Sequence, residues 1–161
     1  MGNLISNERT GEYLQLTDGA TTVLFSVLLL SGSDVAQTKW EQDFVAWLAE
    51  HDHTILGPGM VGFDINDIAW TQEEFSEQKR FVLKVIHKAM KKHRWEALPY
   101  EPPFVLESLT KLRDMVDHYQ QSAARRDKAW QMEYQLEPPR KCPQHAIYEH
   151  SQGCFICRDN A

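Results

Sequence analysis

Hydrophobic and polar residues follow two different patterns along this chain, and the change between them predicts a mixed fold. Residues 12–16 alternate over a short stretch, and residues 21–30 form a nearly continuous run of β-branched and apolar side chains. Asp18-Gly19 lies between them, and this dipeptide is a strong signal for a hairpin turn. The pattern predicts an N-terminal β-hairpin whose second strand, Thr21–Leu30, is central and buried.

From about residue 35 onward the apolar positions recur at helical spacing. Trp40, Phe44 and Trp47 fall on one face of a helix predicted over residues 35–51. Residues three and four apart lie on the same side of a helix, so these three aromatic side chains are expected to enter the main core.

Two more helices are predicted further along the chain. One begins at Thr71, where Thr71 and Glu74 have the spacing of a capping box, and it extends to about residue 94. The other spans about residues 103–136. Its apolar stripe is regular as far as Tyr119 and then fades, so its distal half is expected to project from the body.

Composition and charge restrict the function classes. The chain has 161 residues, of which 42% are hydrophobic, and a formal net charge of −6. This charge disfavours a sequence-independent nucleic-acid binder, which needs a positive surface, but it leaves open a basic protein partner. The simpler interpretation is that a modest negative charge keeps a small protein soluble. The longest apolar run, Val23–Leu30, is far shorter than the roughly 20 residues of a membrane span. The sequence shows no secretory signal, so we expect a soluble cytoplasmic protein.

Four residues near the C-terminus have the spacing of metal ligands. Cys142 and His145 lie three positions apart, as do Cys154 and Cys157. A turn of this length directs two side chains at one point, and two such turns can complete a tetrahedron around Zn²⁺. Thiolate and imidazole ligands suit zinc, and four protein ligands leave no open position for water. The sequence therefore predicts a closed, structural zinc site.

The two turns, Cys142–His145 and Cys154–Cys157, are called hooks below. They resemble the knuckles of zinc ribbons and treble clefs, over about residues 141–158. This resemblance implies metal binding, and residues 146–149 are predicted to form a short strand of a ribbon-like hairpin. His150 is an alternative ligand to His145, although His145 completes the three-residue spacing. Cys154 and Cys157 also have the spacing of a redox pair, but no thioredoxin-like context accompanies them.

One further cluster has residue types that perform catalysis. His51 and His53 begin a polar segment, residues 51–70, that also contains Asp64 and Asp67. Two imidazoles and two carboxylates can hold a catalytic metal or act as an acid–base pair. The simpler interpretation is a solvated loop with one short strand near residues 60–65.

These observations combine into one hypothesis. The fold is expected to be α+β and predominantly helical, with a main domain over residues 1–137 and a zinc-binding tail over residues 138–161. The expected function is a non-enzymatic interaction protein, such as an adaptor, inhibitor or immunity-type protein. Besides the helix predicted over residues 103–136, segment 51–70 is the expected contact surface. Its Asp64 and Asp67 would form an acidic patch, and an exposed Trp70 would be the anchor for a basic partner. The alternative is a small metal-assisted hydrolase that uses the cluster of His51, His53, Asp64 and Asp67.

Overall fold

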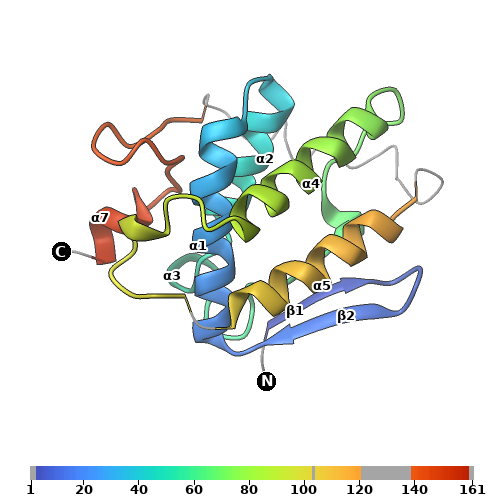
Figure 1. Ribbon diagram of the computed structural model, residues 1–161, viewed down its shortest axis with the longest axis horizontal. Helices are drawn as coiled ribbons and strands as arrows, with labels where there is room; N and C mark the ends of the chain where they lie inside the picture. Colours follow the sequence, from blue (N-terminus) through green and yellow to red (C-terminus); the bar gives the residue numbers. More distant parts are fainter. Residues whose placement is uncertain (1–2, 103, 121–138, 160–161) are drawn as a thin grey trace.

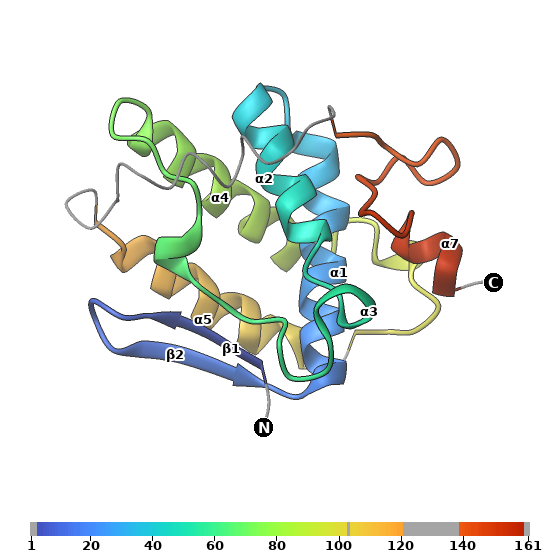
Figure 2. The same cartoon turned by 180° about the vertical axis from the view of Figure 1, so that it is seen from behind.

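The computed structural model describes residues 3–102, 104–120 and 139–159 of the chain. The regular elements of the described residues are β1 (Asn3–Asn7), β2 (Glu12–Leu16), α1 (Asp18–Val35), α2 (Lys39–Ala49), α3 (His53–Leu56), β3 (Phe63–Asp64), the 3₁₀ helix η1 (Ile65–Asp67), α4 (Phe75–Met90), the 3₁₀ helix η2 (Trp95–Ala97), α5 (Val105–His118) and α7 (Phe155–Asp159). The predicted α+β fold with a majority of helix is confirmed. In Figures 1 and 2, α1 stands between the α4–α5 pair and the C-terminal segment.

The sheet has three strands in the order β2-β1-β3. The antiparallel hairpin is made by β1 and β2, and its turn contains Gly11 at a φ of +79°, a conformation that favours glycine. β3 adds a short parallel pair to β1, and it falls within the region where a short strand was predicted. A Cβ at Gly62 would lie only 1.9 Å from the Leu4 carbonyl oxygen, so this close approach of β1 and β3 requires a glycine.

The predicted strand over residues 21–30 is wrong, because this stretch belongs to helix α1. The turn signal at Asp18-Gly19 is instead the first turn of the helix, where the Thr17 hydroxyl caps the Ala20 amide. The side chains from Leu24 to Ser33 are buried without interruption, so α1 is enclosed on every face. A fully buried helix has a continuous apolar sequence, and a continuous run does not distinguish it from a buried strand.

The C-terminal half of α1 packs closely on its neighbours. The Ser31 hydroxyl donates to the Val85 carbonyl of α4 over 2.9 Å, as well as to carbonyls of its own helix. A Cβ at Gly32 would lie 3.0 Å from a methyl group of Val45 in α2. These small residues therefore allow α1 to approach α2 and α4 closely.

Helix α2 begins later than predicted, with Thr38 and Glu41 as its capping box. Its aromatic face enters the core as expected: Phe44 is buried, while Trp40 and Trp47 are partly buried and pack against the core. The Trp40 and Phe44 rings stack with centroids 5.5 Å apart. This helix therefore contributes the aromatic wall of the core.

Helix α4 begins at Phe75, and the capping box predicted at Thr71 and Glu74 does not form. The Thr71 amide and hydroxyl bind the Gln78 side-chain amide instead, at 2.9 Å each. The helix also ends at Met90, four residues before the predicted end. Helix α5 confirms the proximal half of the third predicted helix, whereas its distal half lies mainly in residues 121–138, outside the described residues.

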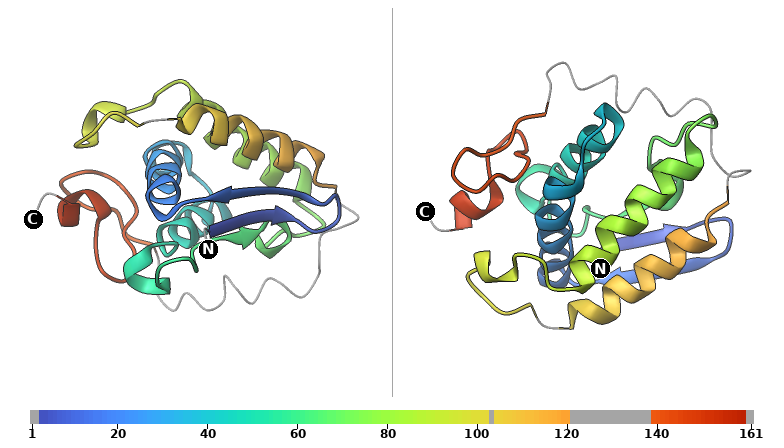
Figure 3. Two further views of the ribbon diagram at one scale, coloured as in Figure 1. Left: turned by 90° about the horizontal axis from the view of Figure 1, so that it is seen from below. Right: turned by 45° about the horizontal axis from the view of Figure 1, so that its top comes forward.

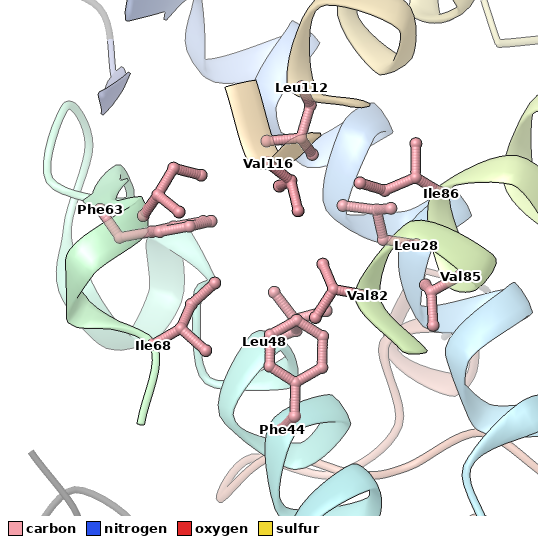
Figure 4. A pocket seen from close by; sticks show the side chains of 11 residues that line it. Leu28, Phe44, Leu48, Phe63, Ile68, Val82, Val85, Ile86, Leu112 and Val116 are labelled. Atoms are coloured by element: carbon pink, nitrogen blue, oxygen red, sulfur yellow. The ribbon is translucent and has the colours of Figure 1, made fainter. Parts of the chain in front are cut away.

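The core contains a small cavity between β3, α1, α2, α4 and α5. Figure 4 shows Phe63 and Ile68 on one side of it, facing Leu28 and Ile86 across the gap. Its volume of about 20 Å³ is enough for one water molecule, and all eleven residues that line it are apolar. Since it offers a substrate no polar group, the cavity is a packing gap in the core.

Among the described residues, no helix is long and apolar enough to cross a membrane.

The burial of Phe44 gives a direct test of the core. Phe44→Ala should lower the free energy of unfolding by about 3–5 kcal/mol, the usual effect of removing a buried phenyl ring. Phe104→Ala is a matched control, because Phe104 is 84% exposed and Phe44 only 4%. Urea denaturation followed by circular dichroism measures both. Equal effects of the two substitutions would contradict this assignment of the core.

Candidate metal centre

The C-terminal segment, residues 139–159, lies against α1 on the side away from α4 and α5 (Figure 3). Four of its apolar side chains are buried and belong to the same hydrophobic cluster as the rest of the protein: Ile147, Tyr148, Phe155 and Ile156. The segment shares the core of the body, so its position is defined by packing as well as by its own turns.

The first hook is a tight turn from Cys142 to His145. The Ala146 amide donates to the Cys142 carbonyl over 2.7 Å, and the Cys142 amide donates to the Ile147 carbonyl over 2.8 Å. Ala146 has a φ of +55°, so the chain reverses immediately after the histidine. This closed turn directs the side chains of Cys142 and His145 to the same side.

The second hook is the passage from a turn into helix α7. His150 and Gly153 exchange two backbone hydrogen bonds, at 3.1 and 2.9 Å, and Gly153 has a φ of +102°. Cys154 directly precedes α7, and Cys157 lies within it. The second pair of cysteines therefore lies at the N-terminus of a helix. The strand predicted for residues 146–149 is reduced to one β-bridge between Lys141 and Tyr148.

The two hooks bring four ligand atoms together. The Nδ1 atom of His145 lies 3.6 Å from the sulfur of Cys142, 3.7 Å from that of Cys154 and 3.3 Å from that of Cys157. The sulfurs of Cys142 and Cys157 are 3.6 Å apart, and all four ligand atoms lie within 4.8 Å of one another. In the part of the chain that the structure describes, this is the one such group of His, Cys, Asp and Glu residues.

These distances match the edges of a tetrahedron around a metal ion. With Zn–S bonds of about 2.3 Å and a Zn–N bond of about 2.0 Å, tetrahedral geometry separates two sulfurs by about 3.8 Å, and a sulfur from a nitrogen by about 3.5 Å. A disulfide would need a separation of about 2.05 Å, and all three cysteines are free. The geometry therefore suits metal coordination.

The protonation of the three thiols also depends on their proximity. Burial favours the neutral form of Cys142, but hydrogen bonds from the His145 and Gln144 amides and from the His145 side chain lower its pKa to about 7. The hydrogen bond to Cys142 raises the pKa of Cys157 to about 11, and burial raises the pKa of Cys154. Ionisation of all three thiols together would therefore need a bound divalent cation, which favours the thiolate form of each ligand.

Polar contacts attach this segment to the ends of the body helices. The Tyr148 amide donates to the Ser33 hydroxyl of α1 over 3.1 Å, and the Ser151 amide donates to the Glu50 carboxylate beside α2 over 3.0 Å. The Arg94 guanidinium donates to the His145 carbonyl and lies 3.4 Å from Asp34. The four side chains of the candidate metal centre are therefore held in a fixed position relative to α1 and α2.

His150, the alternative ligand, does not join the cluster. Its Nδ1 atom accepts a hydrogen bond from the Gln152 amide over 2.8 Å, and its Nε2 atom lies 3.4 Å from an oxygen of Asp52. Its side chain is almost completely buried by these contacts. His150 therefore fixes the turn between the two hooks, and His145 is the imidazole that faces the thiols.

The structure gives the residues of the predicted catalytic cluster separate local roles. His51 packs on the rings of Phe25 and Trp47, and its Nδ1–H donates to the Trp47 carbonyl over 2.8 Å. Burial among these rings lowers the pKa of His51 to about 4, so the imidazole is neutral at pH 7. The side chain of His53 is outside the described residues.

The two carboxylates of that cluster stabilise the backbone. Asp64 is buried and accepts hydrogen bonds from the Ser6 hydroxyl and from the Glu8 and Asn66 amides, at 2.8, 3.0 and 2.8 Å. Asp67 accepts from the Asp64 amide over 3.0 Å. These bonds hold β3 and η1 against β1.

Trp70 was expected to be an exposed anchor for a partner, and this expectation is wrong. Its side chain is 2% exposed, its indole N–H donates to the Ile65 carbonyl over 3.0 Å, and its ring stacks on Tyr119. Since Asp64 is buried as well, the expected binding surface on residues 51–70 is not present in the predicted form.

Comparison of the chain with protein-family models, with curated proteins and with solved structures gave no match.

Proposed function

We propose that Cys142, His145, Cys154 and Cys157 bind one zinc ion in a closed structural site. The observation that supports this proposal is the set of separations near 3.6 Å among three sulfurs and one imidazole nitrogen. Zinc prefers this combination of ligands and a tetrahedral shell. With all four positions filled by protein, the ion would have none for a substrate, so its role is to hold the fold.

The zinc ion would connect the two hooks and keep the C-terminal segment on the body. Between the hooks the chain makes only a few backbone hydrogen bonds, and the buried side chains of the segment are too few for a core of their own. Metal binding adds directly to the free energy of folding at such a site. The division into a body over residues 1–137 and a zinc-binding tail over residues 138–161 stays a prediction of this proposal.

We propose further that the protein acts by binding another protein rather than by catalysis. Support comes from the side chains that could perform chemistry: His51, Asp64 and Asp67 bind backbone groups, and the core cavity is wholly apolar. Enzymes generally place perturbed acids, bases or metals in an accessible pocket with polar groups. The adaptor, inhibitor and immunity-type roles all belong to this class.

The outer face of the β1–β2 hairpin is the surface that best suits a basic partner. A concave region of about 510 Å³ lies along it, and the eight residues that line it include Glu8 and Glu12 but no lysine or arginine. Leu4 and Tyr13 on the same face are 46% and 56% exposed. This surface offers the acidic charge and aromatic anchor that were expected on residues 51–70.

A cation already lies over the ring of Tyr13. The ammonium group of Lys111, from α5, lies 5.4 Å from the centroid of the Tyr13 ring. A cation in this position is attracted by the negative face of the ring. An arginine from a basic partner would replace Lys111 there, while its neighbours pair with Glu8 and with Glu12. The Glu12 carboxylate now lies 2.9 Å from the Nδ1 atom of His118, which the partner would displace.

Metal content tests the zinc site. Protein purified without chelator should contain one zinc per chain by elemental analysis, and His145→Gln should lose most of it, because glutamine is a poor zinc ligand. His150→Gln is the matched control and should keep its zinc, since His150 faces Gln152 and Asp52. Absence of zinc from the wild-type protein, or loss in the control alone, would contradict the proposal.

Charge substitution tests the partner surface. A basic partner protein is first captured from the native lysate. The double variant Glu8→Gln, Glu12→Gln should raise its Kd by about ten-fold, which corresponds to about 1.4 kcal/mol of binding free energy. Glu73→Gln, Glu77→Gln on the exposed start of α4 is a control of equal charge. Titration calorimetry with the purified partner measures both, and high salt should reduce the difference by screening. Equal affinities for the two variants, or capture of acidic partners only, would refute this surface.

A further inference from the structure

The three cysteines of the metal centre differ in their access to solvent. Cys142 and Cys154 are buried, whereas Cys157 is the most exposed of the three. Its sulfur lies 3.6 Å from that of Cys142. A small-molecule reagent in solution can therefore reach one thiol of the centre, and that thiol already has a second thiol beside it.

We propose that Cys157 is an oxidation site, and that a two-electron oxidant of the peroxide class converts Cys142 and Cys157 into a disulfide with release of the metal. This inference rests on the proposed zinc site. Zinc keeps its thiolate ligands deprotonated, so the exposed sulfur of Cys157 retains the nucleophilic form that attacks peroxide.

The reaction balances in two steps. The Cys157 thiolate attacks one oxygen of hydrogen peroxide, the O–O bond breaks, and Cys157 becomes a sulfenic acid while hydroxide leaves. The Cys142 thiolate then attacks the sulfur of the sulfenic acid, a second hydroxide leaves, and the disulfide forms. The two sulfurs lose two electrons in total, and the peroxide gains them.

Formation of this disulfide removes two of the four ligands in the proposed coordination shell of the metal. The two sulfurs need to approach by about 1.5 Å to reach the disulfide bond length of about 2.05 Å. Only Cys154 and His145 then remain as ligands, and structural zinc is held by four. The ion is therefore released when the bond forms.

The disulfide connects the same two hooks that the metal connects. Cys142 belongs to the first hook and Cys157 to the second, so the oxidised chain keeps a covalent link in place of the ion. The contacts of Tyr148 with Ser33 and of Ser151 with Glu50 lie between them and do not involve the ligands. Zinc and the disulfide thus act as alternative links, and a thiol reductant with zinc reverses the exchange.

Two ligand-swapped variants test the inference. Cys157→His and Cys154→His each keep four zinc ligands, and both should contain one zinc when reduced. With hydrogen peroxide and a chromogenic zinc indicator, the wild-type protein and Cys154→His should release zinc. Cys157→His should release it slower by on the order of ten-fold, because its two remaining thiols are buried. If the reduced wild-type protein and both reduced variants lack zinc, the proposed zinc site itself is wrong. If they contain zinc but peroxide does not release it, only the proposed oxidation is wrong.

Peptide mapping identifies the bond. Combined digestion with trypsin and a glutamate-specific protease cuts after Lys141, Glu149 and Arg158, which places Cys142 on one peptide and Cys154 with Cys157 on another. The proposed disulfide joins the two peptides in the oxidised wild-type protein, whereas a Cys154–Cys157 bond stays within the second. Far-ultraviolet circular dichroism should be unchanged by oxidation. Equal zinc release from all three proteins, a bond within the second peptide, or loss of helical signal would overturn the proposal.

Discussion

The complete burial of the middle of helix α1, residues 24–33, is the constraint on which the rest of the structure depends. Ten consecutive residues from Leu24 to Ser33 are shielded from solvent, so neighbours are needed on every side. Helices α2, α4 and α5 and the hairpin provide most of them. The C-terminal segment binds the last turns through Ser33. The position of the metal centre thus follows from the need to cover the end of this helix.

The candidate metal centre and the hydrophobic core meet at this end of α1. Ile147 and Ile156 are fully buried, yet the turns that present them contain few backbone hydrogen bonds and two residues at positive φ, Ala146 and Gly153. A short segment of this kind loses much conformational entropy on folding. A metal ion bound by four ligands from two hooks would offset this loss, and the buried apolar side chains hold the segment on the body.

The sequence was sufficient to identify the four residues that lie together in the candidate metal centre, because the spacing of Cys142, His145, Cys154 and Cys157 is a local property. The contacts that position them were not predictable, since Ser33, Glu50 and Arg94 are distant in the chain. Arg94 was assigned to the end of a helix, whereas it lies beyond α4 and reaches Asp34 and the His145 carbonyl. No local pattern indicates such long-range contacts.

The fold could be predicted at the level of its class and of the helices with a clear polar face, α2, α4 and α5. The error at α1 has a physical cause: a helix buried on all faces lacks the polar stripe that reveals its period. Trp70 illustrates the reverse problem, because an aromatic residue among polar neighbours in the sequence is buried by tertiary contacts with Tyr119 and Phe75.

X-ray absorption spectroscopy at the zinc edge tests the central claim most directly, because it reports the ligands of the ion in solution. The account predicts a first shell of three sulfurs at about 2.3 Å and one imidazole nitrogen at about 2.0 Å, with no water. A shell dominated by oxygen and nitrogen, or one that contains a bound water molecule, would contradict a closed site formed by Cys142, His145, Cys154 and Cys157.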